Sequence, residues 1–120
     1  MTLRIAYVTS GMGSVGTAIC QKLARNGHTV VAGCAPNSPR KAGWLREQRE
    51  LGFDFIASEG NAADWQSTVA AFTKVKAEVG EIDVLVNNAG IAGMNAPTVD
   101  YPVEEWEKVL RVNLTSQFLC

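Results

Sequence analysis

The sequence lacks an excess of charge of either sign, and it lacks a long apolar run. Among its 120 residues, 11 Lys and Arg balance 12 Asp and Glu, so the basic surface typical of nucleic-acid binding is missing. No apolar stretch approaches the ~18 residues of a membrane span. The N-terminus also lacks the apolar core and cleavage site of a secretory signal. These absences predict a cytoplasmic protein with no nucleic-acid or membrane partner.

Histidine and cysteine are also scarce. The single histidine, His28, is expected at the surface between a helix end and a strand. The three cysteines, Cys20, Cys34 and Cys120, are odd in number and widely spaced, which argues against a disulfide framework or a zinc site. We therefore expect free thiols, no bound metal, and Cys20 and Cys34 as small core residues.

Short apolar runs alternate with helical periodicity along the whole chain, whose length is typical of one domain. The runs predict strands over residues 5–8, 29–34, 53–57 and 82–86, and helices over 15–25, 41–51, 65–79 and from 102 onward. Candidate buried residues on the helices are Trp44, Leu45 and Leu51, with an apolar face formed by Trp65, Val69, Phe72 and Val79. This alternation predicts an α/β fold, a doubly wound parallel sheet with ligands at the carboxyl ends of its strands.

A glycine-rich turn, Gly11-x-Gly13-x-x-Gly16, follows the first predicted strand and opens the first helix. In a dinucleotide-binding turn the first glycine permits the sharp bend, and the second lets the backbone approach a pyrophosphate. The third lets the helix pack closely on the strand. The helix N-terminus then offers free N–H groups and a positive dipole to the phosphates. The same spacing also fits a tight surface turn without a ligand.

The loop after the second strand bears on the choice of cofactor. An NAD site uses a carboxylate about 20 residues after the glycines to bind the ribose 2′-hydroxyl. No Asp or Glu lies near Cys34, and the next carboxylate is Glu47, inside a predicted helix. The loop offers Ser38 and Arg40 instead, and a guanidinium suits a 2′-phosphate. This predicts NADP(H), unless Arg40 is merely a solvated charge at a helix start.

Several landmarks resemble the N-terminal half of the short-chain dehydrogenase/reductase family across the whole chain. They are the segment 9–16, Asn88-Ala89-Gly90 after an apolar strand, and Asn113. Residues 4–91 are similar, more narrowly, to acetoacetyl-CoA reductases, through the segments 4–9, 31–34, 36–40 and 51–61. The resemblance implies a Rossmann domain over residues 1–120 with strand order 3-2-1-4 and flanking helices. It also implies a homotetramer that uses NADPH to reduce a 3-oxoacyl-CoA, such as acetoacetyl-CoA, to the 3-hydroxyacyl-CoA.

The resemblance also implies roles for individual residues. Cofactor-binding residues would be Gly11, Met12, Gly13, Ser14, Val15 and Gly16 of the turn, with Gly13, Ser14 and Val15 at the pyrophosphate. Further along the chain they would be Ser38 and Arg40 at the 2′-phosphate, Gly60, Asn61 and Ala62 at the adenine, and Asn88, Ala89, Gly90 and Ile91 along the ribose and nicotinamide. Asn113 would be the catalytic asparagine that holds a water in the proton relay. Alternatively, Asn113 is a core asparagine that bonds the nearby backbone.

Two stretches depart from the family pattern. Ser10 and Ser14 replace glycines, and a serine with positive φ at either position would be strained by ~1 kcal/mol. The segment 92–102 lacks the basic character expected of an acetoacetyl-CoA reductase and is similar to sugar and alcohol dehydrogenases instead. A short-chain dehydrogenase of one of those substrate classes is therefore an alternative.

The largest departure is a missing catalytic pair. The family uses a tyrosine with a lysine four residues later, plus a serine, but the residues four positions after Tyr7 and Tyr101 are Gly11 and Glu105. These catalytic residues are expected beyond Cys120, with the domain incomplete at its C-terminus and residues 82–86 forming a bare sheet edge. We expect this chain to supply the cofactor half of the enzyme, completed within a homo-oligomer or by a partner chain. The alternative is a non-catalytic dinucleotide-binding fragment or subunit.

Overall fold

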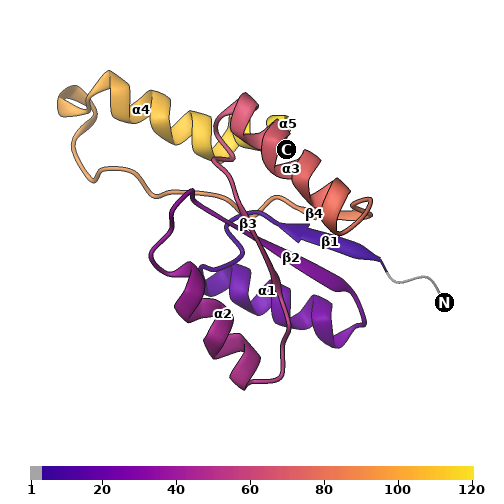
Figure 1. Ribbon diagram of the computed structural model, residues 1–120. Coiled ribbons are helices and arrows are strands. Elements are labelled where there is room, and N and C mark those ends of the chain that lie inside the picture. The colour runs from indigo at the N-terminus through magenta and orange to yellow at the C-terminus, as the bar shows by residue number, and fades with distance from the viewer. Residues whose placement is uncertain (1–3) are drawn as a thin grey trace.

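The computed structural model describes residues 4–120 and contains one parallel four-stranded sheet with helices on both faces (Figure 1). The strands are β1 (Ile5–Val8), β2 (Thr29–Cys34), β3 (Ile56–Glu59) and β4 (Val84–Val86). Their order in the sheet is β3-β2-β1-β4, which confirms the predicted order. Within residues 4–120, no helix is long and apolar enough to cross a membrane.

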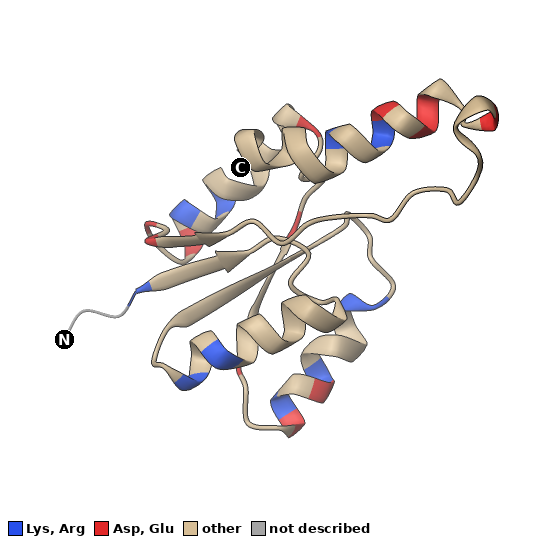
Figure 2. Cartoon of the chain, turned by 180° about the vertical axis from the view of Figure 1, so that it is seen from behind, with Lys and Arg blue, Asp and Glu red and all other residues tan. Residues whose placement is uncertain are grey.

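The helices divide between the two faces of the sheet (Figure 1). One face carries α1 (Ser14–Arg25) and α2 (Lys41–Glu50). The other carries α3 (Trp65–Glu78), α4 (Val103–Leu110) and α5 (Ser116–Leu119), with a π-helical turn over Arg111–Thr115 that joins the last two. Most charged residues lie on the helices and connecting segments, β3 ends on Glu59, and β1 and β2 carry none (Figure 2).

The core lies on both faces of the two central strands. Val8 and Ala32 face α1 and α2, where they pack with Cys20, Trp44 and Phe55. Tyr7 and Val31 alternate to the other face and pack beneath α3. Burial on both faces explains why β1 and β2 have almost continuous apolar sequences. Cys20 is a core residue as predicted, whereas Cys34 is only half-buried.

The two outer strands differ from their predicted limits. β3 begins at Ile56, because Phe53 and Phe55 stack on each other before the strand and Phe55 stacks on Trp44. β4 begins only at Val84, because the Asp83 carboxylate accepts a hydrogen bond from the Ile5 amide at 2.8 Å. Side-chain contacts that no local pattern contains therefore decide where these strands begin.

The predicted apolar face of α3 is partly wrong. Trp65 and Val69 are exposed, and α3 buries Thr68, Ala71 and Val75 against the sheet. The chain approaches closely near Gly60, where a Cβ would lie 2.9 Å from the Ala71 Cβ, so only a small side chain fits at position 71. Phe72 packs on Tyr7 further along the helix.

The other expectations for the helices have mixed outcomes. Leu51, expected to be buried, is 65% exposed just past the end of α2. Asp64 caps α3 by accepting a hydrogen bond from the Ser67 amide at 2.8 Å.

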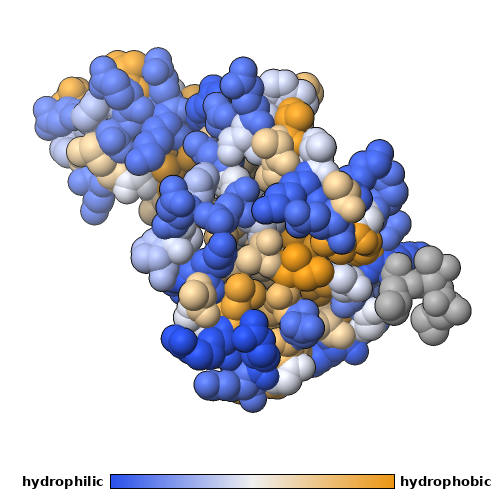
Figure 3. Space-filling model, in the orientation of Figure 1, coloured by the Kyte–Doolittle hydropathy of each residue, from blue (hydrophilic) through white to orange (hydrophobic). Residues whose placement is uncertain are grey.

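Two apolar surfaces are left uncovered. β4 is an edge strand, as predicted, and its Leu85 is 37% exposed. The face of α4 and α5, which we call the α4–α5 stripe, exposes Val103, Trp106, Leu110, Leu114 and Phe118. Elsewhere, apolar atoms reach the surface near the centre of the molecule, where the sheet runs (Figure 3).

Candidate functional site

The carboxyl ends of the strands bring the predicted segments together at one end of the sheet. Thr9, which follows β1, is the central link. Its hydroxyl oxygen accepts hydrogen bonds from the backbone amides of Asn88 and Ala89 at 2.8 and 2.9 Å. The Asn88 side-chain amide donates to the Ser10 carbonyl at 3.2 Å. The glycine turn and the loop after β4 therefore form one unit.

Each glycine of the turn has a different surrounding. A Cβ on Gly11 would lie 2.8 Å from the Ala32 Cβ, and a Cβ on Gly16 would lie 2.8 Å from the Gly11 Cα and overlap the Ser10 carbonyl. A Cβ on Gly13 would meet nothing closer than 3.6 Å. Gly11 and Gly16 are thus needed for packing, whereas Gly13 borders open space.

Gly13 is also the residue that precedes the first turn of α1. It makes no side-chain cap, and the first turn of α1 contains no acidic residue. Ser14 and Val15 are exposed there, while Met12 is buried in the core. The N–H groups and positive dipole of this helix end are thereby available to an anion.

The two serines of the turn differ in conformation. Ser10 has a φ of 50°, in the left-handed region where glycine is favoured, which confirms the predicted strain at this position. Ser14 is the first residue of α1 and has no positive φ. Only the first of the two departures from the family pattern therefore strains the backbone.

Replacing Ser10 with glycine is expected to stabilise the protein by about 1 kcal/mol, because glycine adopts this φ without a Cβ clash. Thermal unfolding should show a midpoint roughly 4 °C higher than that of the wild type. Ser14→Gly is the control and should not stabilise the protein, because glycine is a poorer helix former. A Ser10→Gly variant no more stable than the wild type would contradict the assignment of strain.

The loop after β2 reaches back to the glycine turn. The Arg40 guanidinium donates a hydrogen bond to the Met12 carbonyl at 3.2 Å. The Ser38 hydroxyl accepts from the Arg40 backbone amide at 3.4 Å. Arg40 is exposed and Ser38 half-buried, so an arginine and a hydroxyl lie together beside the start of α1.

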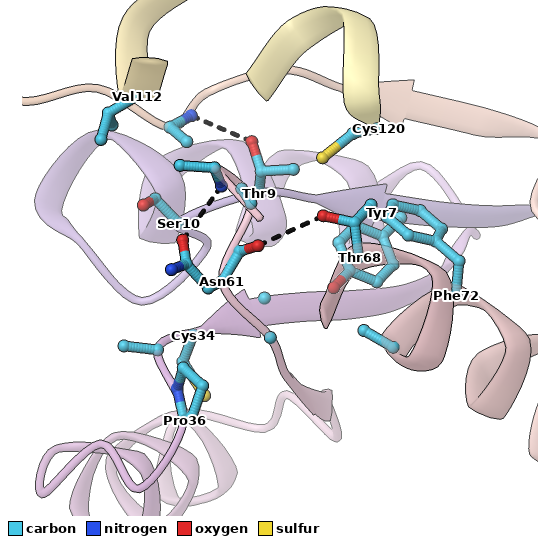
Figure 4. A pocket seen from close by; sticks show the side chains of 17 residues that line it. Tyr7, Thr9, Ser10, Cys34, Pro36, Asn61, Thr68, Phe72, Val112 and Cys120 are labelled. Carbon is cyan, nitrogen blue, oxygen red and sulfur yellow. Dashed lines mark hydrogen bonds between the residues drawn. The ribbon is translucent and has the colours of Figure 1, made fainter. Parts of the chain in front are cut away.

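A pocket of about 370 Å³ opens beside these loops, with walls from β1, β2, the segment after β3, α3 and the end of the chain (Figure 4). Among the predicted cofactor-binding residues, Gly60, Asn61, Ala62 and Ala89 line it, and Ser10 of the glycine turn lines it as well. The Asn61 carbonyl accepts a hydrogen bond from the Thr68 hydroxyl at 3.2 Å. Figure 4 places Val112 and Cys120 across the pocket from Cys34 and Pro36.

The pocket also has lining residues that the sequence analysis missed. The Tyr7 hydroxyl donates to the Ser58 hydroxyl at 2.9 Å, and its ring stacks on Phe72 with centroids 4.4 Å apart. Burial raises the pKa of Tyr7 from its usual value, so the phenol stays neutral at physiological pH. Tyr7 lies within an apolar strand, where no local pattern distinguishes a pocket residue from a core residue.

Asn113 contacts the loop after β4 through both atoms of its amide. Its side-chain oxygen accepts from the Ile91 amide at 2.7 Å, and its side-chain nitrogen donates to the Ile91 carbonyl at 2.9 Å. A Cβ on Gly90 would lie 3.4 Å from the same oxygen. These hydrogen bonds are the ones predicted by the alternative interpretation of Asn113, in which it is an inward-facing asparagine that bonds the nearby backbone. They join Asn113 to the segment 88–91.

Other polar groups add little to this site. Tyr101 lies apart from it, with its hydroxyl bonded to the Met94 amide at 3.2 Å. In the part of the chain that the structure describes, no group of three or more His, Cys, Asp or Glu could hold a metal ion.

The comparison with known proteins agrees with this arrangement. The family model for short chain dehydrogenases matches residues 4–120. The chain belongs to the short-chain dehydrogenase family. An acetoacetyl-CoA reductase from Cupriavidus necator is 62% identical to this chain over 118 residues, 98% of this chain and 48% of the relative. Nodulation protein G from Azospirillum brasilense is 43% identical over 118 residues, which again are 98% of this chain and 48% of the relative.

Solved structures of the family share the fold. Gluconate 5-dehydrogenase from Burkholderia cenocepacia, in complex with NADP and tartrate, superposes with a TM-score of 0.82 at 31% identity, over 98% of this chain and 46% of that one. A blue fluorescent protein from a metagenomic library, in complex with NADPH, gives a TM-score of 0.82 at 26% identity. This match covers 97% of this chain and 47% of that one. The chain spans about half the length of the curated relatives it matches.

Proposed function

We propose that this chain is the cofactor-binding half of an NADP(H)-dependent reductase that converts a 3-oxoacyl-CoA, such as acetoacetyl-CoA, to the 3-hydroxyacyl-CoA. The observation that carries the cofactor proposal is the hydrogen bond from the Arg40 guanidinium to the Met12 carbonyl. It holds the cation of the loop after β2 beside the glycine turn, where it could reach the 2′-phosphate of a cofactor whose pyrophosphate lies at the start of α1. The identity to an acetoacetyl-CoA reductase supports the substrate class.

The residues present fit NADP(H). The uncapped start of α1 and the open space at Gly13 suit a pyrophosphate, and the pocket beside β2 and β3 has room for an adenine. The proposed contacts are Gly13, Ser14 and Val15 with the pyrophosphate, Ser38 and Arg40 with the 2′-phosphate, Gly60, Asn61 and Ala62 with the adenine, and Asn88, Ala89, Gly90 and Ile91 with the ribose and nicotinamide. Gly11, Met12 and Gly16 would shape the turn that presents the pyrophosphate contacts.

The chain's own contribution to the reaction would be binding and orientation. NADPH, when bound, supplies the hydride. The double hydrogen bond from Asn113 fixes the backbone of Ile91, and Thr9 fixes Asn88 and Ala89, so the proposed nicotinamide wall is held from two sides. We propose that Asn113 also holds the water of the proton relay, beside the nicotinamide wall that its hydrogen bonds position.

Completion by further polypeptide is the second part of the proposal. The β4 edge and the α4–α5 stripe expose apolar groups that a second copy or a partner chain would cover. A partner chain of different sequence, unlike a second copy, would also supply the tyrosine and lysine, in a cytoplasmic assembly. Sedimentation of the purified chain is expected to show association, and a stable soluble monomer of 12.9 kDa would contradict this.

Two alternatives have specific support. A non-catalytic dinucleotide-binding module would use the same uncapped start of α1 and the same pocket, which would bind a dinucleotide without any catalytic group. A sugar or alcohol dehydrogenase is favoured by the similarity to gluconate 5-dehydrogenase.

One experiment separates these functions. NADPH is titrated into the protein, and its absorbance is then followed with acetoacetyl-CoA or a keto-gluconate as substrate. NADPH binding by this chain, with oxidation by acetoacetyl-CoA once the polypeptide that supplies the tyrosine and lysine is added, supports the proposed reductase. NADPH binding without oxidation in that completed assembly supports the module, turnover of only the sugar acid supports the second alternative, and absence of NADPH binding contradicts the cofactor assignment.

A further inference from the structure

The carboxylate of Glu59, at the end of β3, holds the loop after β2 at two points. One oxygen accepts a hydrogen bond from the Asn37 backbone amide. The other accepts from the Lys41 ammonium at 2.9 Å. The parallel pairing of Cys34 with Glu59 places this carboxylate beside the start of the loop.

The two contacts enclose the residues proposed to hold the 2′-phosphate. Asn37 and Lys41 lie on either side of Ser38 and Arg40 in the chain. Asn37 has a φ of 57°, a left-handed conformation that costs free energy for a residue with a Cβ. A charge-assisted hydrogen bond to its amide offsets that cost and stabilises the turn.

The loop is also held from its other side. The Arg40 guanidinium bonds the Met12 carbonyl, so contacts from β3 and from the glycine turn fix opposite sides of the same short loop. A loop fixed in this way needs little ordering when a phosphate binds, which increases affinity for that phosphate.

We propose that Glu59 is a positioning residue that holds the 35–41 loop ready for a 2′-phosphate and thereby sets the preference for NADP(H) over NAD(H). This inference rests on the proposed cofactor. A ligand with a free 2′-hydroxyl places no phosphate on this loop and gains little from its order.

Glu59 could act instead as a repelling charge, and this possibility predicts the opposite result. The Lys41 ammonium keeps the pKa of the Glu59 carboxyl below its usual value, so Glu59 is ionised at neutral pH. Its pairing with Lys41 offsets the negative charge, and both groups are exposed, so solvent screens the remainder. Removal of Glu59 should therefore weaken phosphate binding by loosening the loop, whereas a repelling Glu59 would make removal strengthen it.

The test compares 2′,5′-ADP with 5′-AMP, which differ in the 2′-phosphate, by calorimetric titration of the protein. In Glu59→Ala, we expect the dissociation constant for 2′,5′-ADP to rise roughly tenfold and that for 5′-AMP to change by less than about twofold, because only the former uses the ordered loop. Glu59→Gln keeps an acceptor for the Asn37 amide and should recover part of the loss. Glu81→Ala is the matched control, since it removes another exposed lysine–glutamate pair, with Lys76 at 3.0 Å.

Other changes in the binding of these two ligands would contradict the inference. Unchanged or tighter binding of 2′,5′-ADP by Glu59→Ala overturns the positioning role, and so does an equal loss for both ligands. If circular dichroism shows that Glu59→Ala does not fold, the ratio of the dissociation constants for 2′,5′-ADP and 5′-AMP is measured on Glu59→Gln instead. A wild type without preference for 2′,5′-ADP contradicts the proposed NADP(H) function itself, which is a separate failure.

Discussion

Replacing Gly16 with alanine is expected to destabilise the protein by at least about 2 kcal/mol, although alanine is the better helix former. The new Cβ would overlap the Ser10 carbonyl and lie 2.8 Å from the Gly11 Cα. Both are backbone atoms of a turn already held by Thr9 and Asn88, so they cannot move aside without breaking those contacts. The gain in helix propensity, about 1 kcal/mol, is smaller than the steric cost.

Thermal unfolding followed by circular dichroism measures this effect. The midpoint for Gly16→Ala should fall by roughly 10 °C. Gly43→Ala in α2 is the matched control, because its Cβ would meet nothing closer than 4.0 Å, and it should leave stability unchanged or raise it. Equal midpoints for the two variants would show that the turn is looser than the structure indicates.

Replacing Arg40 with alanine is expected to weaken NADPH binding roughly 10- to 100-fold, the range for loss of a charged, forked hydrogen-bond donor to a phosphate. NADH has a hydroxyl in place of that phosphate, so its affinity should change by less than about threefold. Loss of the bond to Met12 affects both cofactors alike and does not alter their ratio.

Titration of NADPH and NADH by fluorescence, on the wild type and the variant, gives that ratio directly. Arg40→Lys should be intermediate, because it keeps the charge but not the planar fork. Arg49→Ala removes an exposed arginine from the far end of α2 and should leave both affinities unchanged. Equal losses for NADPH and NADH in Arg40→Ala would reject the phosphate role.

Much of the fold follows from local pattern. β1 and β2 were predicted with the limits that the structure shows, because strands covered on both faces need continuous apolar residues. The limits of β3 and β4 were wrong because Phe55 and Asp83 make contacts with Trp44 and Ile5, which lie far away in the sequence.

The candidate site divides in the same way. The glycine spacing and the lack of a carboxylate after β2 are visible in the sequence. Together they identify the glycine turn and Arg40 as candidate phosphate-binding groups, and the structure brings these two segments into contact. Tyr7 as a pocket wall, the two bonds from Asn113 to Ile91, and the contacts of Glu59 with Asn37 and Lys41 are not visible there.

By itself, the sequence determined the order and type of the elements, the glycine turn, and Arg40 as the cation of the loop after β2. Those features depend on each residue and its near neighbours, through periodicity, backbone freedom and charge. Only the tertiary structure decided that Ser10 is the strained serine, that small residues of α3 face the sheet, and that Glu59 holds the loop. These depend on how closely helix, strand and loop approach one another in space, which packing of the whole chain sets.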